Sequence, residues 1–286
     1  MNPLQLPADW ISRLSRYSIA TRSKIRGHHK GSNRSRRFGS SMDFSDFREY
    51  HPGDDVRHID WNVYARTERV YIKRFLDEQE MRVHVMIDGS KSMKNKWLFA
   101  KQLAFSIGSI VLSHDDKLSV SVGFGKEWAF NKKGKSAQKL FNYFLFSLPE
   151  AEEKGFSGDV QFHQAKDSTV LFVVSDALEP LESWERFFAR AVKYVKDVRF
   201  LHLSDSQERE PAFQGDLRLI DDESWDEYNV TMTARTADDY NRLLLQHLEG
   251  LRALCRRYGI EYLPVHVEDG IQHVIMHQLA KQKWIR

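Results

Sequence analysis

Cysteine is nearly absent from this chain of 286 residues, which contains Cys255 alone. A single cysteine excludes an internal disulfide and any zinc cluster built from several cysteines, and it is typical of a reducing compartment, so we expect a cytoplasmic protein. Long apolar runs are also missing. The most apolar stretch, Trp97 to Leu112, contains Lys101 and is shorter than the roughly 20 residues that span a bilayer. The first residues, Met1 to Arg13, lack the apolar core of a signal peptide.

Motifs of self-contained catalysis are missing too. The chain has no G-x-S-x-G, H-E-x-x-H, Walker or Rossmann glycine pattern. We therefore expect a protein that is not an enzyme and assign no catalytic residue. The only dense group of acids and histidines comprises His51, Asp54, Asp55, His58 and Asp60. Its spacing fits no zinc or two-metal signature, and we interpret it as a turn-rich loop held by ion pairs to Arg48, Arg57 and Arg66. A metal-dependent phosphoesterase is the enzymatic alternative.

Acidic residues are absent between Trp10 and Met42, a stretch that holds nine lysines and arginines. We treat residues 1–25 as a basic amino-terminal arm. Aromatic residues are sparse after Trp10, with only Tyr17 and Phe38, so platforms for stacking single-stranded nucleic acid are few. We favour a solvated or intramolecularly paired arm, with nucleic-acid or other polyanion binding as the alternative.

From Arg82 onward, apolar runs of strand length alternate with helical patterns, which is typical of βα units on a mainly parallel sheet. The predicted strands are 82–87, 117–124, 169–174, 198–203 and 260–267, with a hairpin strand at 127–130 and a short strand at 216–220. The predicted helices are 96–112, 136–148, 181–195, 237–258 and 270–282. The sequence thus predicts a doubly wound α/β domain over 82–286. Residues 26–81, rich in charges and turn signals and ending in a strand at 70–75, are predicted to form an appendage.

Hard oxygen ligands follow the first strand of this domain. Asp88, Ser90 and Ser92 lie within five residues after the apolar run 83–87. Ligands in open α/β sheets collect at the carboxyl ends of strands, and carboxylate and hydroxyl oxygens suit Mg²⁺ or Mn²⁺. The structural alternative is that the two serines cap the following helix and Asp88 accepts local backbone N–H groups.

Further ligands must come from other strand ends. Asp176 follows the strand 169–174 and Asp205 follows the strand 198–203, both in a Ser-Asp dipeptide. We prefer Asp176 because its strand is more apolar and is therefore expected nearer the centre of the sheet. Ser157 is the candidate for a third hydroxyl ligand, and Asp159 is its alternative.

The pattern D-G-S-K-S followed by Met93, with Ser-Asp at 175–176, resembles the metal-ion-dependent adhesion site of von Willebrand factor A domains. The block Phe44 to Trp61, followed by Ala65-Arg66-Thr67, resembles the hallmark of the bacterial family called domain of unknown function fifty-eight. Later segments, 217–223 and 253–262, are similar to that family as well. The resemblance extends from about residue 26 to the carboxyl terminus.

This resemblance implies a Rossmann-like sheet with Mg²⁺ held directly by Ser90 and Ser92 and through water by Asp88 and Asp176. An open position on the metal would take a Glu or Asp from a protein partner. Such proteins are typically associated with MoxR-type AAA+ ATPases, so the resemblance implies an adaptor of such an ATPase. Many longer relatives carry membrane helices ahead of this region, whereas we expect no membrane span in this chain. Ser157 stands where the family pattern has threonine.

Overall fold

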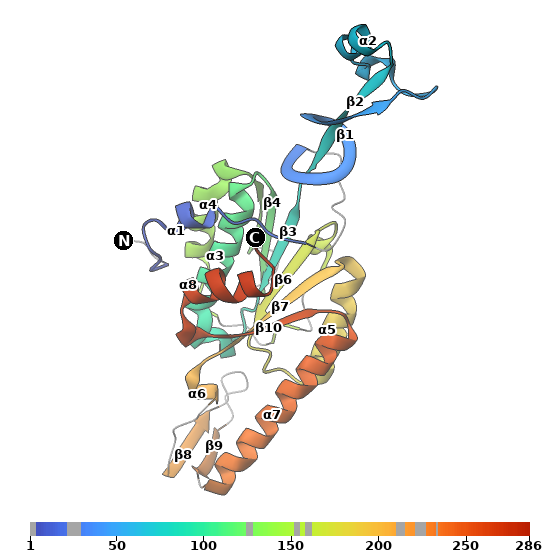
Figure 1. The fold of residues 1–286 in the computed structure, drawn as a ribbon. Coiled ribbons are helices and arrows are strands. Elements are labelled where there is room, and N and C mark those ends of the chain that lie inside the picture. The colour runs from blue at the N-terminus through green and yellow to red at the C-terminus, as the bar shows by residue number, and fades with distance from the viewer. Residues whose placement is uncertain are drawn as a thin grey trace. The chain divides into compact units, whose positions relative to one another are not determined.

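The computed structural model describes residues 4–21, 30–123, 128–151, 155–157, 162–209, 215–220, 227–232 and 234–286 (Figure 1). The chain divides into two compact units. We call residues 25–81 the hairpin unit and residues 1–24 with 82–286 the α/β unit. Within the described ranges, every helix is too short or too polar to cross a lipid bilayer.

A six-stranded sheet forms the centre of the α/β unit. Its strands are β3 (Arg82–Ile87), β4 (Lys117–Val122), β5 (Ala129–Lys133), β6 (Val170–Ser175), β7 (Asp197–Ser204) and β10 (Glu261–His266). The order across the sheet is β10-β7-β6-β3-β4-β5, and every pairing is parallel except that of the edge strand β5 with β4. The predicted α/β fold with a mainly parallel sheet is confirmed, and each predicted strand of this sheet overlaps an observed one.

Helices cover both faces of the sheet, which explains why most residues of its central strands are apolar. All six residues of β6 are buried, as are five of the six in β3. A strand covered on both faces needs apolar side chains at every position instead of at alternate ones. These two adjacent strands therefore form the dry middle of the domain.

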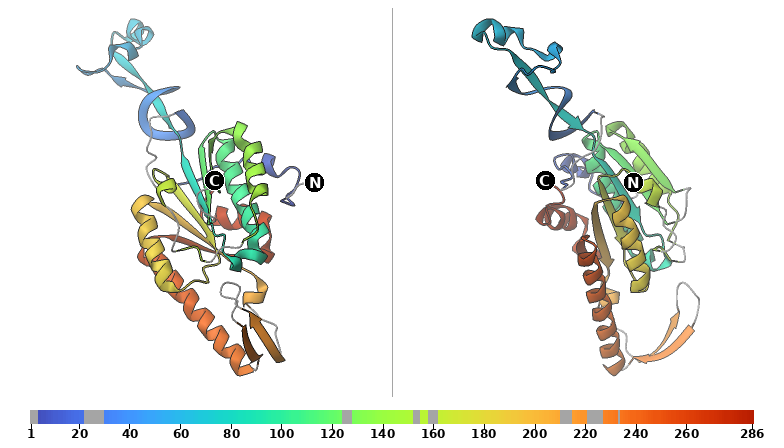
Figure 2. Two further views of the ribbon diagram at one scale, coloured as in Figure 1. Left: turned by 180° about the vertical axis from the view of Figure 1, so that it is seen from behind. Right: turned by 90° about the vertical axis from the view of Figure 1, so that its right-hand side faces the viewer.

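The two helical layers are distinct in Figure 2. One layer contains α1 (Trp10–Leu14), α3 (Trp97–Ser113), α4 (Gln138–Ser147) and α8 (Ile271–His273). The other contains α5 (Leu181–Tyr194) and α7 (Ala234–Arg257), which pack on each other and on β7 and β10. The short helix α6 (Ser206–Arg209) follows β7, and the helix predicted over 270–282 forms as α8 followed by π-helical turns at Val274–Leu279.

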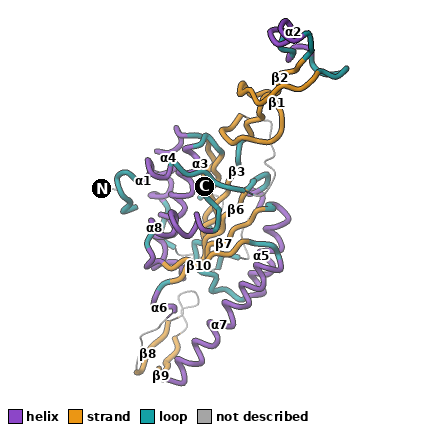
Figure 3. Tube along the Cα trace, in the orientation of Figure 1, coloured by secondary structure: helices purple, strands orange, loops and turns teal. Residues whose placement is uncertain are grey.

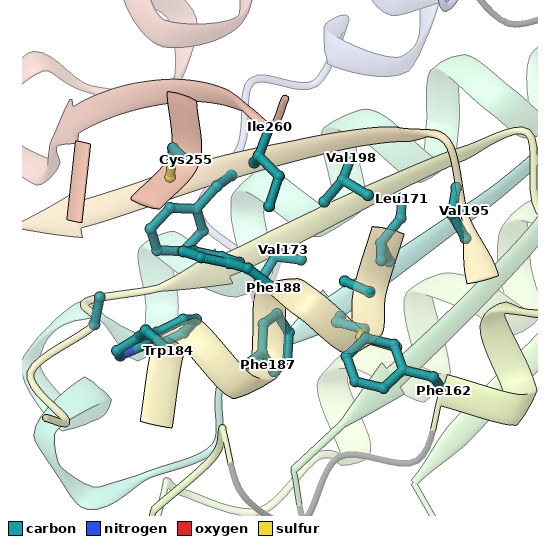
Figure 4. Packing of buried hydrophobic residues seen from close by; sticks show 14 of the residues in the cluster. Phe162, Leu171, Val173, Trp184, Phe187, Phe188, Val195, Val198, Cys255 and Ile260 are labelled. Carbon is teal, nitrogen blue, oxygen red and sulfur yellow. The ribbon is translucent and has the colours of Figure 1, made fainter. Parts of the chain in front are cut away.

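An aromatic cluster joins α5 to the sheet (Figure 4). Trp184, Phe187 and Phe188 are all fully buried, and they face Val173 of β6 and Phe200 of β7. The ring centroid of Trp184 lies 5.2 Å from that of Phe200. Each such ring buries a large apolar area, so α5 is held by packing against β6 and β7.

The amino-terminal segment packs on the α/β unit. Trp10 of α1 is buried and donates its indole N–H to Ser106 of α3 at 2.9 Å. Arg199 of β7 is 2% exposed and donates to both carboxylate oxygens of Asp197, at 2.9 and 3.0 Å. The same guanidinium also donates to the backbone carbonyl oxygens of Ala20 and Trp284. One buried cation thereby ties both ends of the chain to the sheet.

The hairpin unit contains β1 (Lys30–Glu49), a 3₁₀ turn at Val56–His58, α2 (Trp61–Thr67) and β2 (Tyr71–Gln79). β1 and β2 pair antiparallel with several register shifts. Figure 3 shows both as strands, in orange. The strand predicted at 70–75 corresponds to the first part of β2, whereas β1 and α2 are not predicted from the sequence. In the α/β unit, β8 (Gly215–Ile220) forms an antiparallel pair with β9 (Glu227–Met232) between α6 and α7.

Candidate functional site

The carboxyl ends of β3 and β6 bring the predicted acidic residues together. Ile87, the last residue of β3, is in register with Val174 of β6, and the backbone N–H of Asp88 donates to the carbonyl of Val174 at 2.8 Å. Asp88 therefore lies beside the Ser175-Asp176 dipeptide. The adjacency follows from the apolar sequences of β3 and β6, which place the two strands side by side at the centre of the sheet.

Asp88 is fixed by hydrogen bonds at both carboxylate oxygens. The backbone N–H of Ser90 donates to Oδ1 at 2.8 Å, and the Ser175 hydroxyl donates to Oδ2 at 2.5 Å. The hydroxyls of Ser90 and Ser92 form a hydrogen bond of 3.0 Å, in which either oxygen can be the donor. Ser90 precedes the 3₁₀ turn Lys91–Lys96 and makes no side-chain capping bond to it. The capping role considered for Ser90 is therefore absent, while Asp88 does accept a local backbone N–H.

A buried lysine lies at the same edge of the sheet. Lys96 is 1% exposed, and its Nζ lies 3.0 Å from Oδ2 of Asp176, which is itself almost completely buried. Among the described residues, this ion pair is the polar contact given for Oδ2 of Asp176. Lys96 also forms an ion pair with Glu208 of α6. Burial alone lowers the pKa of Lys96, but the charges of Asp176 and Glu208 outweigh it and raise that pKa above its usual value.

The pKa of Asp88 reflects its burial beside a second carboxylate. Burial, and secondly the negative charge of Asp176, raise the pKa of Asp88 to about 7. Hydrogen bonds from Ser175 and Ser90 lower that pKa but are outweighed. A cation between the two carboxylates would relieve both the burial cost and the mutual repulsion of their negative charges.

Asp205, the alternative to Asp176, serves a local role. It follows β7, which is separated from β3 by β6, and its Oδ1 accepts the backbone N–H of Glu208 at 2.9 Å. Glu208 in turn accepts the backbone N–H of Asp205 at 3.2 Å. Asp205 thus orients the first turn of α6 and the side chain that reaches Lys96.

Ser157, the predicted third hydroxyl ligand, points to a glutamate. Its hydroxyl donates to Oε2 of Glu179, and its backbone N–H donates to Oε1 of the same side chain at 2.9 Å. The N–H of Phe156 also donates to Glu179. The structure therefore places Ser157 in a capped loop with Glu179. Its alternative, Asp159, lies outside the described residues.

The oxygen donors can be compared with the needs of Mg²⁺. Adjacent ligands of an octahedral Mg²⁺ with bonds of about 2.1 Å are separated by about 3.0 Å. The Ser90 and Ser92 hydroxyl oxygens have this separation. Asp176 Oδ2 adds a buried oxygen whose partner among the described residues is the Lys96 ammonium at 3.0 Å. Ser90, Ser92, Asp88 and Asp176 supply the donor types that a hard divalent cation prefers. Within the described ranges, no three His, Cys, Asp or Glu side chains cluster in a metal-binding group.

The sequence matches the family described as "Protein of unknown function DUF58" over residues 46–250, which is most of the chain. The chain belongs to this family. It is 22% identical over 260 residues to the uncharacterized protein Rv1480 of Mycobacterium tuberculosis, and equally to the uncharacterized protein Mb1516 of Mycobacterium bovis. Each alignment covers 86% of this chain and 81% of the relative.

Two solved structures are similar to this DUF58 protein at a low level. BatB from Bacteroides thetaiotaomicron gives a TM-score of 0.35 with 14% identity, covering 70% of this chain and 98% of that one. An aerotolerance-related membrane protein from Bacteroides fragilis gives a TM-score of 0.36 with 14% identity, covering 70% and 99%. Similarity this weak supports no inference about site or activity.

The DUF58 match begins at residue 46, just before the group of acids and histidines His51, Asp54, Asp55, His58 and Asp60 in the hairpin unit. Asp54 accepts from Arg48 at 2.6 Å and from the backbone N–H of His51 at 2.9 Å, and these two contacts lower its pKa. Arg57 forms an ion pair with Asp55 at 2.7 Å, and this contact lowers the pKa of Asp55 to about 2. These contacts agree with a loop held by ion pairs.

Asp60 and Arg66 make their contacts at α2, which follows this loop. Asp60 accepts the backbone N–H groups of Asn62 and Val63 at the start of α2 and forms an ion pair with Lys73 at 3.1 Å. The predicted pairing of Arg66 with a carboxylate is wrong, because its Nε donates to the backbone carbonyl of Asn62 one helical turn earlier. Position 66 is within α2, which the sequence did not predict, so its side chain follows the helix surface.

Lys96, Glu208 and Glu179 are the site residues that sequence reasoning missed. Lys96 and Glu208 are 112 positions apart, and neither belongs to a recognisable motif. Lys96 occurs within the predicted start of a helix, where a lysine is ordinarily exposed. No local pattern signals its burial.

Proposed function

We propose that this DUF58 protein is a cytoplasmic, non-enzymatic module that binds a protein partner through a divalent metal. The proposal adopts the resemblance to von Willebrand factor A domains, with Ser90 and Ser92 as direct ligands of Mg²⁺ or Mn²⁺ and Asp88 and Asp176 as water-mediated ligands. The bound metal would supply a coordination position for an acidic side chain of the partner. The partner class is a MoxR-type AAA+ ATPase or its client.

The observation that carries the proposal is the pair of serine hydroxyls 3.0 Å apart beside a buried, hydrogen-bonded aspartate. Hydroxyl and carboxylate oxygens at the carboxyl edge of a parallel sheet are the chemistry that a hard cation needs. The side chains of Asp88 and Ser90 are held by the β3 end and the turn after it, so these two ligands need little reorganisation on binding. Ser157 is left out of the proposed ligand set because its hydroxyl is engaged by Glu179.

Metal binding is tested directly with Mn²⁺, by calorimetry and by the loss of the free Mn²⁺ resonance signal. Asp88→Ala and Ser90→Ala should lose binding while keeping a wild-type circular dichroism spectrum. Ser147→Ala is the matched control, because Ser147 lies at the exposed end of α4 and its hydroxyl bonds only a local carbonyl. Equal Mn²⁺ binding by the wild type and Asp88→Ala would refute the site.

Partner capture is tested separately, with a MoxR-type ATPase from the same organism immobilised on resin. Retention of the DUF58 protein should require Mg²⁺, disappear in excess EDTA, and disappear for Ser90→Ala. Retention that is unchanged in EDTA would remove the metal from the mechanism.

The two alternatives receive no support from particular contacts. For a phosphoesterase, the carboxylates of Asp54, Asp55 and Asp60 are all engaged by cations or by helix capping. For polyanion binding by the arm, Trp10 and Leu14 are buried in the α/β unit. Mn²⁺-stimulated turnover of a panel of phosphoesters would support the phosphoesterase. Salt-sensitive binding of a polyanion that is lost when residues 1–37 are removed would support polyanion binding by the arm.

A further inference from the structure

Lys96 is a buried cation at the carboxylates of the proposed metal site. Its side chain is 1% exposed, and the two acids that face it are Asp176, 2% exposed, and Glu208. Lys96 ends the same 3₁₀ turn, Lys91–Lys96, that carries Ser92. The turn therefore carries both a proposed hydroxyl ligand and the lysine that pairs with Asp176.

Burying an ammonium group is unfavourable unless carboxylates and hydrogen bonds compensate it. Here two carboxylates from different parts of the fold do so, one after β6 and one on α6. Glu208 is oriented for this contact by its backbone N–H bond to Asp205 at 2.9 Å. Two separate segments thus converge on the lysine, the loop after β6 and the segment that forms α6, which is more than an incidental surface contact requires.

A divalent cation and this ammonium need the same oxygen. Oδ2 of Asp176 has Lys96 Nζ at 3.0 Å and accepts no hydrogen bond from the described residues. Like charges this close repel strongly in a dry environment. Asp176 can therefore serve a metal fully only when the lysine withdraws from it, and Glu208 offers the lysine a second partner.

We propose that Lys96 is the built-in cation of this site: it balances Asp176 and Glu208 in the metal-free protein and competes with a divalent metal for Asp176. The competition with metal rests on the function proposed above, whereas the charge-balancing role does not. Two consequences follow. The metal-free protein is folded, and metal binding is weaker than the oxygen donors alone would allow.

The test compares the wild type with Lys96→Met, which keeps the length of the side chain and removes the charge. Lys94→Met is the matched control, because Lys94 belongs to the same turn and is exposed. Lys96→Met should bind Mn²⁺ at least tenfold more tightly than the wild type. In EDTA it should unfold at lower urea concentration, and Mn²⁺ should restore the midpoint. Lys94→Met should behave as the wild type in both measurements.

Two further variants keep the test decisive. Lys96→Gln replaces Lys96→Met if the methionine variant does not fold in EDTA, and it should show the same gain in Mn²⁺ affinity. Lys96→Arg retains the charge and should show no gain. If both uncharged variants stay unfolded even with Mn²⁺, the proposal is overturned, because the metal should replace the missing charge.

The outcomes separate this inference from the proposed function. If Lys96→Met binds Mn²⁺ and the wild type does not, the lysine inference stands and the metal-dependent function of the natural protein falls. If both bind equally, the lysine inference falls and the proposed function stands. If no variant binds Mn²⁺, the proposed function and the competition with metal are both overturned, and the urea midpoints in EDTA alone decide the charge-balancing role: a lower midpoint for Lys96→Met than for Lys94→Met supports it, and equal midpoints overturn it.

Discussion

Acidification provides a sharp test of how the central strand β3 is packed. His84 of this strand is fully buried, and its Nε2 lies 2.8 Å from the hydroxyl of Ser121 on β4. Burial lowers the pKa of His84 from 6.5 to about 3. The folded protein therefore keeps this imidazole neutral at pH values where the unfolded chain takes up a proton.

The sign and size of the effect follow from these two pKa values. Below pH 6.5 the unfolded state binds one proton more than the folded state, so stability falls as the pH falls, and the loss levels off near pH 3. At 1.36 kcal/mol per pH unit, the two units between pH 6.5 and pH 4.5 correspond to about 2.7 kcal/mol. The full contribution of His84 at pH 3 is about 5 kcal/mol.

The assay is urea unfolding at pH 7.5 and pH 4.5 for the wild type and His84→Gln. Glutamine does not titrate and can still bond Ser121, so the variant should lose about 2.7 kcal/mol less than the wild type over this interval. Other titrating groups, including the buried His202, are common to both proteins and cancel in the comparison. His273→Gln, at an exposed histidine, is the control and should match the wild type. Equal pH dependence in the wild type and His84→Gln would refute the reasoning.

Three further predictions concern packing and capping. Arg199→Met should lower the free energy of unfolding by about 3–5 kcal/mol, because Asp197 is left buried without its cation; a loss below about 1 kcal/mol in urea would contradict this. Gly108→Val should cost about 1–3 kcal/mol or more, because a Cβ at this position would lie 2.2 Å from the Phe141 ring; an unchanged melting temperature would contradict the close α3–α4 contact. Asp60→Ala removes the cap of α2 and should cost about 1 kcal/mol locally, seen as roughly fivefold faster amide exchange in α2; unchanged exchange would argue against the cap.

The local sequence was a good guide to the strands of the sheet and to the first part of the site. The run 83–87 is apolar at nearly every position, which predicts a strand covered on both faces, and Asp88 must then follow at its carboxyl end. The choice of Asp176 over Asp205 used the same logic, since the more apolar strand lies next to β3. The burial of a strand is reflected in the apolar character of consecutive residues, so the strands and the acidic residues that follow them can be predicted from the sequence alone.

The hairpin unit and the carboxyl-terminal helix were harder to predict. β1 pairs with β2 through repeated register shifts, so its residues follow no regular alternation. The segment α2 is short and depends on the Asp60 cap more than on an apolar stripe. In the last helix, the change to π-helical turns at Val274–Leu279 leaves the predicted span intact but alters which side chains share a face.

The amino-acid sequence by itself determined the alternation of strands and helices, the mainly parallel sheet, and the placement of Asp88, Ser90 and Ser92 after a buried strand. Tertiary structure alone decided which charges meet at that edge. Lys96 reaches Glu208 across 112 positions, and Ser157 meets Glu179 instead of the other predicted ligands. The physical reason is the sequence separation of the interacting residues. Local periodicity predicts whether a residue is buried, whereas a buried ion pair depends on which loops the order of the strands brings side by side.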